Sequence, residues 1–233
     1  MAKVIGMIGG TGPQGQGLAL RWGMAGESVI MGSRQQEKAD RISAEVNKKL
    51  GQDLVIPRTN ETCVKESDII LCTTPFDYIV KTITPFIEYF NADHIIVDVT
   101  VPLKPFEKGK MVDVLSELEH NAQSASELLR KVIPKDVPLV GAFKTLSNAT
   151  LQDVDRLPVL NQDVFIFGRD KQAKHVVKEK AALIKNLRPV DSGGTLSARH
   201  VERFTAFLIG LNRRYKTHDC GFRVTGLPED RDW

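Results

Sequence analysis

The hydrophobic and polar positions of this chain follow two patterns that alternate along its length. Short, nearly continuous apolar runs are followed by longer stretches in which apolar residues recur with helical spacing. The apolar runs predict β-strands at residues 4–8, 28–31, 54–56, 68–73, 94–99, 137–143 and 164–168. The helical spacing predicts α-helices at residues 13–25, 35–50, 76–89, 171–187 and 195–212.

The regular alternation of strand and helix indicates the fold class. Runs such as 68–73 are apolar through their centres, which is typical of strands buried on both faces of a sheet. Alternating β and α elements predict an α/β fold with a doubly wound parallel sheet of the Rossmann type. The second half is shorter and less regular, with a short edge element at 188–191. We therefore expect a dinucleotide-binding domain at residues 1–147 and a smaller C-terminal domain at 148–233.

A glycine-rich turn lies between the first predicted strand and the first predicted helix. Gly10, Gly12 and Gly15 form the pattern G-x-G-x-x-G, which is a weak signal by itself but stands here in the context of a βαβ unit. Such glycines let the backbone approach a pyrophosphate, and the helix N-terminus offers its N–H groups to that anion. A turn without a ligand is the alternative. The residues predicted to bind a dinucleotide here are Gly10, Thr11, Gly12, Pro13, Gln14 and Gly15.

The end of the second predicted strand indicates which dinucleotide is bound. Proteins that bind NAD usually place an acidic residue there, which accepts hydrogen bonds from the ribose 2′-OH. This chain has Ser33 and Arg34 instead, with Lys38 in the following helix. A hydroxyl, a guanidinium and an ammonium suit a 2′-phosphate, because Arg binds phosphate in a forked geometry and Lys adds a point charge. The sequence favours NADP over NAD.

Two buried strands end in threonine and proline. In open α/β sheets, ligands bind outside the carboxyl ends of the strands, and proline there ends the strand ladder. We expect these strand ends to form a wall near the nicotinamide, although each residue could equally be a plain strand terminator. The residues concerned are Thr73, Thr74, Pro75, Thr100, Val101 and Pro102.

Composition narrows the possible partners and the compartment. The chain has 233 residues, of which 42% are hydrophobic, and a net charge of +3, so no large field favours nucleic acid or a membrane. We expect no binding to either. Its three cysteines are odd in number and form no C-x-x-C pair, and the chain enters its first apolar run without a leader, so we expect a cytoplasmic protein with free thiols. The five histidines show no metal-binding spacing, and we expect no metal site.

Several segments together resemble one family. These segments are I-G-G-T-G-P-Q-G at 8–15, G-S-R at 32–34, E-K-A at 37–39, the strand ending at Gly168, L-R-P-V-D-S-G at 187–193 and L-I-G-L-N at 208–212. The chain is similar over nearly its full length to the coenzyme F420-dependent NADP oxidoreductases. The N-terminal motifs are shared with many dinucleotide reductases, including the cytosolic domains of ferric reductases. The two C-terminal motifs are more specific.

The resemblance implies reversible hydride transfer between NADPH and the deazaflavin ring of coenzyme F420. It also implies a cleft between the Rossmann domain and the smaller C-terminal domain, in which the two rings stack. Both reactants are cofactors, so the protein supplies positioning and water exclusion rather than reactive side chains. This agrees with a sequence that contains no recognisable catalytic constellation.

One position departs from the family pattern. The resemblance places the segment containing Ala142 and Lys144 against the nicotinamide, and characterised members tend to carry His or an amide where this chain has Lys144. A lysine beside the hydride path could orient the substrate or donate a proton to it. It could also pair with an acidic neighbour. The departure bears on the identity of the second substrate and not on NADP.

Alternative functions therefore stay open at this stage. The enzyme could reduce a flavin, a ferric chelate or a small carbonyl compound, or the chain could be a non-enzymatic NADP-binding redox sensor. Family likeness and the apolar faces of the predicted helix 195–212 lead us to expect a homodimer. A basic stretch near the C-terminus would either receive the anionic tail of F420 or form a solvated face after a helix end: Arg213, Arg214, Lys216, His218 and Arg223.

Overall fold

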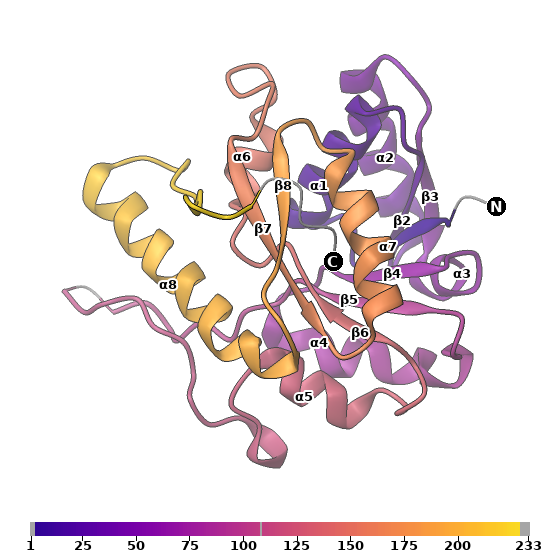
Figure 1. The fold of residues 1–233 in the computed structure, drawn as a ribbon. Helices are drawn as coiled ribbons and strands as arrows, with labels where there is room; N and C mark the ends of the chain where they lie inside the picture. The colour runs from indigo at the N-terminus through magenta and orange to yellow at the C-terminus, as the bar shows by residue number, and fades with distance from the viewer. Residues whose placement is uncertain (1–2, 108, 229–233) are drawn as a thin grey trace.

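The computed structural model describes residues 3–107 and 109–228, and its centre is one eight-stranded sheet (Figure 1). The strand order is β3-β2-β1-β4-β5-β6-β7-β8, in which β1 to β6 are mutually parallel and β7 pairs antiparallel with β6. The strands are β1 (Ile5–Ile8), β2 (Val29–Ser33), β3 (Val55–Thr59), β4 (Ile69–Cys72), β5 (Ile95–Asp98), β6 (Leu139–Gly141), β7 (Gln162–Gly168) and β8 (Leu187–Asp191). The predicted α/β doubly wound fold is confirmed.

Helices cover both faces of this sheet (Figure 1). The α-helices are α1 (Pro13–Met24), α2 (Gln36–Leu50), α3 (Asn60–Lys65), α4 (Phe76–Ile83), α5 (Ala125–Val132), α6 (Asn148–Gln152), α7 (Lys171–Ala182) and α8 (Ala198–Tyr215). Three 3₁₀ turns are η1 (Thr84–Tyr89), η2 (Glu119–Asn121) and η3 (Thr195–Ser197). The predicted helix 76–89 is thus divided, because Pro85 lies in the first turn of η1 and has no N–H with which to continue the α-helical ladder.

The last two strands differ from the expected all-parallel sheet. The segment 142–161 leaves β6 at its carboxyl end and enters β7 from that same end of the sheet, so no crossover helix is needed and β7 runs antiparallel to β6. β8 then pairs parallel to β7 through α7. Residues after 147 therefore extend the sheet of the first half, and the division into domains at 147 and 148 stays a prediction.

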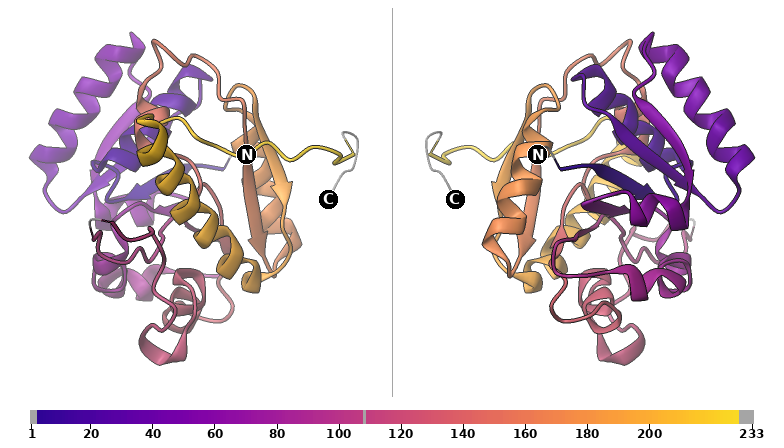
Figure 2. Two further views of the ribbon diagram at one scale, coloured as in Figure 1. Left: turned by 90° about the vertical axis from the view of Figure 1, so that its left-hand side faces the viewer. Right: turned by 90° about the vertical axis from the view of Figure 1, so that its right-hand side faces the viewer.

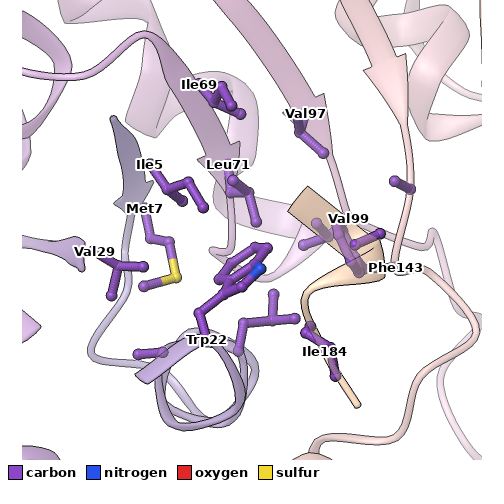
Figure 3. Close-up of a cluster of buried hydrophobic side chains, with 14 of the residues drawn as sticks. Ile5, Met7, Trp22, Val29, Ile69, Leu71, Val97, Val99, Phe143 and Ile184 are labelled. Atoms are coloured by element: carbon purple, nitrogen blue, oxygen red, sulfur yellow. The ribbon is translucent and has the colours of Figure 1, made fainter. Parts of the chain in front are cut away.

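Alternation along the strands explains why the sheet is buried on both faces. Ile69 and Leu71 of β4 belong to one core, and Ile70 and Cys72 belong to the other. Figure 3 shows the first of these cores gathered around Trp22 of α1. The Trp22 ring meets the edge of Phe143 at 5.5 Å between centroids, and its Nε1 donates a hydrogen bond to the Lys180 carbonyl of α7 at 2.8 Å.

Helix α8 lies apart from these cores, along the outside of the molecule (Figure 2). Its inner residues Ala198 and Val201 pack on Phe165 and Phe167 of β7 in a third, smaller apolar cluster. The chain after α8 is irregular as far as residue 228, and residues 229–233 lie outside the described part of the chain. The position of α8 leaves one of its sides facing the carboxyl ends of the central strands.

Candidate active site

A cavity of about 1270 Å³ opens at the carboxyl ends of the central strands, and α8 closes one side of it. The predicted site residues that line it are Thr11, Gly12, Pro13, Gln14, Ser33, Arg34, Lys38, Thr73, Thr74, Pro75, Thr100, Val101 and Lys144. Gly10, Gly15, Pro102 and Ala142 are not among its lining residues. The fold thus brings together predicted site residues that are up to 133 positions apart in the sequence, from Thr11 to Lys144.

The glycines of the turn after β1 serve two different purposes. A Cβ at Gly15 would lie 2.3 Å from the Gly10 carbonyl oxygen, so Gly15 lets α1 pack closely on the turn. Gly9 adopts φ +73°, and its N–H donates to Asn60 Oδ1 at 3.1 Å. A Cβ at Gly12 would meet only ordinary contacts, 3.4 Å from Gly9 O, so this position is open towards the cavity. Close packing therefore explains why position 15 is a glycine, and the need for space beside a ligand explains why position 12 is one.

The N-terminus of α1 points a set of N–H groups at this cavity. Gly12 is the N-cap residue and provides no side-chain cap, Pro13 occupies the first turn, and no acidic residue lies there. The first N–H groups of a helix have no partner within the helix, and the helix dipole adds partial positive charge. An anionic group such as a pyrophosphate fits this end of the cavity.

The end of β2 supplies positive charge to the same cavity. Ser33 is buried and its Oγ accepts a hydrogen bond from the Gln35 N–H at 3.3 Å, whereas Arg34 and Lys38 are exposed. Neither cation forms an ion pair with any residue that the structure describes. Both are therefore available to a phosphate group.

The threonines of the expected wall are not equivalent. Thr73 Oγ1 donates to the Ile8 carbonyl at 2.8 Å, and Thr100 Oγ1 donates to Asp98 Oδ1 at 2.7 Å. Thr74 Oγ1 is buried and has no hydrogen-bond partner among the described residues. Because a buried hydroxyl without a partner is costly, Thr74 is the threonine of this wall that a ligand would satisfy. This orphaned hydroxyl, the open Gly12 and the unpaired cations together fit a phosphorylated dinucleotide.

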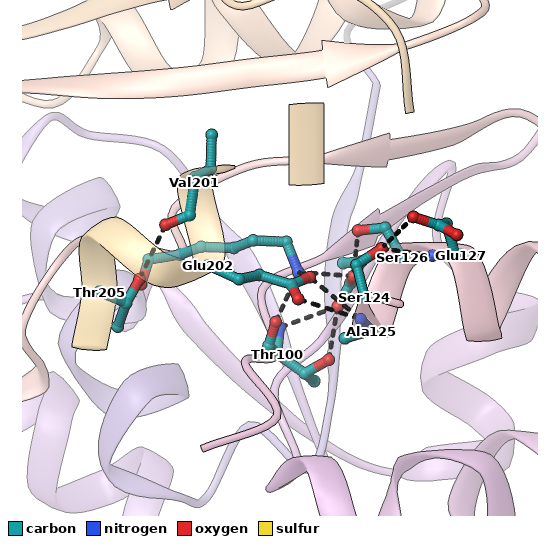
Figure 4. A network of polar contacts seen from close by, with 10 residues as sticks. Thr100, Ser124, Ala125, Ser126, Glu127, Val201, Glu202 and Thr205 are labelled. Atoms are coloured by element: carbon teal, nitrogen blue, oxygen red, sulfur yellow. Dashed lines mark hydrogen bonds and ion pairs between the residues drawn. The ribbon is translucent and has the colours of Figure 1, made fainter. Parts of the chain in front are cut away.

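Lys144 is held in a network of buried polar groups (Figure 4). Its Nζ lies 2.6 Å from Asp98 Oδ2, 3.1 Å from Glu202 Oε1 and 2.5 Å from the Thr100 carbonyl oxygen. The side chains of Lys144 and Asp98 have no solvent exposure, and that of Glu202 has 1%. The ammonium group therefore has acidic partners, which is one of the possibilities that the sequence left open. Its roles in orienting the substrate or donating a proton stay predictions.

The electrostatics of this network follow from burial and from the neighbouring charges. Burial works against the charged form of Lys144, but the Asp98 and Glu202 carboxylates outweigh it and raise the pKa of Lys144 above its usual value. Burial raises the pKa of Glu202, an effect that Lys144 opposes and Asp98 reinforces. Lys144 is thus held in its charged form, and Glu202 takes up a proton more readily than an exposed glutamate.

The sequence led us to expect that the C-terminal part closes a cleft, but it did not identify the α8 residues that line the cavity. The lining residues from α8 are Thr205, Leu208, Ile209 and Asn212. Cys220, in the irregular segment after α8, also lines the cavity. The signal was available, because residues 208–212 form one of the segments that carried the family resemblance, but the helical spacing alone indicated only buried or interface positions. Asn60, Tyr78 and Asn148 also line the cavity without having been predicted.

The basic stretch after α8 is divided among several environments. Arg213 lies over the ring of Phe106, 3.5 Å from its centroid, and Arg223 Nη1 lies 3.5 Å from Asp163 Oδ1. Arg214, Lys216 and His218 are exposed. Within residues 3–107 and 109–228, the structure contains no cluster of three potential metal ligands and no helix that is long and apolar enough to cross a membrane. Cys63, Cys72 and Cys220 are free thiols.

Comparison with known proteins identifies sequence relatives of this chain and solved structures with a similar fold. A family model described as NADP oxidoreductase coenzyme F420-dependent matches residues 4–102. A protein of Methanothermobacter thermautotrophicus named F420-dependent NADP reductase is 34% identical over 232 residues, which cover 98% of this chain and 97% of that protein. A protein of the same name from Methanocaldococcus jannaschii is 34% identical over 227 residues, covering 96% and 98%.

A crystal structure of a candidate F420-dependent NADP reductase from Arthrobacter sp. FB24 is among the solved structures with a similar fold. It superposes with a TM-score of 0.77 and covers 96% of this chain and 99% of its own. At 20% identity, this match shows the fold alone.

Proposed function

Because the chain belongs to the family of coenzyme F420-dependent NADP oxidoreductases, we propose that it transfers a hydride reversibly between NADP(H) and coenzyme F420. The observation that carries this proposal is a single cavity that joins the cationic end of β2 to the α8 wall. One end suits a phosphorylated dinucleotide, and space remains at the other end for a second ring system. A redox sensor would have no need of this second compartment.

We assign the NADP contacts by the chemistry of each part of the cavity. The α1 N-terminus and the turn at Gly12 would hold the pyrophosphate. Ser33, Arg34 and Lys38 would hold the 2′-phosphate through charge-assisted hydrogen bonds. Gly10 and Gly15 act indirectly, since they let the turn and α1 pack closely enough to present those N–H groups.

The strand ends and α8 would enclose the reacting rings. The nicotinamide of bound NADPH supplies the hydride, and the deazaflavin of F420 accepts it. The wall formed by residues 73–75, 100 and 101 orients the nicotinamide, while Leu208 and Ile209 of α8 provide apolar contact from the opposite side. Hydride transfer between two cofactors requires close approach and exclusion of water rather than a general acid.

Absorbance spectroscopy tests the proposed reaction. When the protein is mixed with NADPH and F420, we expect the deazaflavin absorption band to bleach as F420 is reduced, and to return when excess NADP⁺ is added. NADH should be a poor substitute for NADPH. If the band does not bleach, while a flavin, a ferric chelate or a small carbonyl compound is reduced, the assignment of the second substrate is wrong.

We further propose that the protein is a cytoplasmic homodimer. Free thiols suit a reducing compartment, and large apolar side chains on η3 and α8 are exposed in the single chain, including Leu196 of η3 at 63% and Phe207 of α8 at 57%. We expect light scattering to give twice the mass of the chain, and Phe207→Glu to give the monomer mass. A monomer mass for the unmodified protein at all concentrations would contradict the dimer.

A further inference from the structure

The buried group Asp98, Lys144 and Glu202 joins three segments that each contribute to the cavity. Asp98 is the last residue of β5, Lys144 follows β6, and Glu202 lies in the second turn of α8. The three side chains share contacts of 2.6 and 3.1 Å through the Lys144 ammonium group. We propose that this group positions α8 against the dinucleotide wall and so sets the width of the compartment for the second substrate.

Asp98 and Lys144 also hold cavity-lining backbone. Asp98 Oδ1 accepts from both the N–H and the Oγ1 of Thr100, at 2.8 and 2.7 Å, and Thr100 lines the cavity. The Lys144 ammonium donates to the Thr100 carbonyl at 2.5 Å. The Lys144 carbonyl in turn accepts from Thr205 Oγ1 of α8 at 3.0 Å. The strand end, the 144–148 segment and α8 are therefore connected directly to one another.

Glu202 is the member that ties α8 to the rest of the protein. Besides Lys144, its carboxylate accepts the N–H of Ala125 at the start of α5, at 3.1 Å to each oxygen. Figure 4 shows Glu202 extending from α8 towards Thr100 and Ala125. The lining residues Thr205, Leu208 and Ile209 follow it by one to two turns on the same helix. A shift at Glu202 would therefore move the α8 wall.

The chemistry of the group suits positioning better than simple stabilisation. Apolar residues of similar volume often replace a buried ion cluster without loss of stability, so charge is a poor means of stabilising a core. Charge-assisted hydrogen bonds are directional, however, and define the register between the elements that they join. All three N–H donors of the Lys144 ammonium have acceptors within the protein, namely Asp98, Glu202 and the Thr100 carbonyl. Lys144 is therefore a positioning residue that acts through Glu202 and Thr100.

The test uses two substitutions of Glu202, because Asp98 remains to pair with Lys144 when Glu202 is lost. Glu202→Ala removes the hydrogen bonds to Lys144 and Ala125. Glu202→Gln keeps one oxygen that can still accept hydrogen bonds from the Lys144 ammonium and the Ala125 N–H. Glu27→Ala is the control, since Glu27 is a partly buried carboxylate that pairs with a lysine, Lys180, and is not among the residues that line the cavity. Three quantities are compared with the wild type: kcat, KM for F420 and the Kd for NADPH from fluorescence titration.

For Glu202→Ala we expect kcat/KM for F420 to fall roughly ten- to hundredfold, because small misplacements of reacting groups have effects of this size. The Kd for NADPH should stay within about threefold, Glu202→Gln should lose much less activity, and Glu27→Ala should match the wild type. The proposal is overturned if Glu202→Ala keeps wild-type kinetics with F420, if NADPH binding weakens equally, or if Glu27→Ala shows the same loss.

A second readout separates this inference from the proposed function, on which the kinetic test rests. Hydrogen–deuterium exchange of the α8 amides at residues 202–212 should become about tenfold faster in Glu202→Ala, as expected for the loss of a charge-assisted hydrogen bond. Exchange in the turn after β1 should not change. If the wild type fails to reduce F420, the proposed function fails while this measurement still decides the inference, and unchanged α8 exchange overturns it.

Discussion

Gly12→Val is expected to abolish NADPH binding while the fold survives. A Cβ at this position would make only ordinary contacts, 3.4 Å from Gly9 O and 3.9 Å from Thr73 O, and φ is −77°, which any residue adopts. The branched side chain would instead occupy the space over the α1 N-terminus. Losing two hydrogen bonds to a charged pyrophosphate costs roughly 3–6 kcal/mol, or about a hundredfold to ten-thousandfold in Kd. NADPH fluorescence titration measures this change.

The control for this experiment is Gly26→Ala. Gly26 lies in the turn after α1 and adopts φ +79°, so alanine there strains the backbone without touching the cavity. We expect Gly26→Ala to lower the melting temperature slightly and to bind NADPH normally. If Gly12→Val has a native circular dichroism spectrum and still binds NADPH with wild-type affinity, the pyrophosphate does not lie at the turn after β1.

Arg34→Ala is expected to raise KM for NADPH by roughly tenfold to a hundredfold, because this is the loss of affinity expected when one charge-assisted hydrogen bond to phosphate is removed. Arg34 has no ion-pair partner among the described residues, so its removal strands no buried charge and should not affect folding. KM for NADH should barely change, because NADH has no 2′-phosphate. Steady-state kinetics with both dinucleotides measures the difference.

Arg41→Ala provides the matched control for Arg34→Ala. Arg41 is an exposed arginine of α2 that pairs with Glu45 and does not line the cavity. It should leave both KM values unchanged. An equal rise of KM for NADPH and NADH in Arg34→Ala would mean that the guanidinium contacts a part common to both cofactors, and the assignment of NADP through this residue would be wrong.

The sequence by itself determined the dinucleotide half of this protein. The turn at Gly10–Gly15, the strand that precedes it and the cations at Arg34 and Lys38 all lie in one contiguous segment, from β1 to the first turn of α2. Local propensity, apolar periodicity and glycine spacing act over a few residues, so their consequences can be predicted without knowing the rest of the chain. The same alternation predicts that the strands of this half are parallel and joined by right-handed crossovers.

Only the tertiary structure decided the rest of the site. Lys144 meets Asp98 and Glu202 across 46 and 58 positions of sequence, and no local pattern distinguishes such a buried pair from an exposed lysine. The antiparallel β7 and the α8 wall likewise depend on where the chain returns after residue 147. These contacts form because apolar burial brings distant segments together, and the charged groups that become enclosed must then find partners within reach.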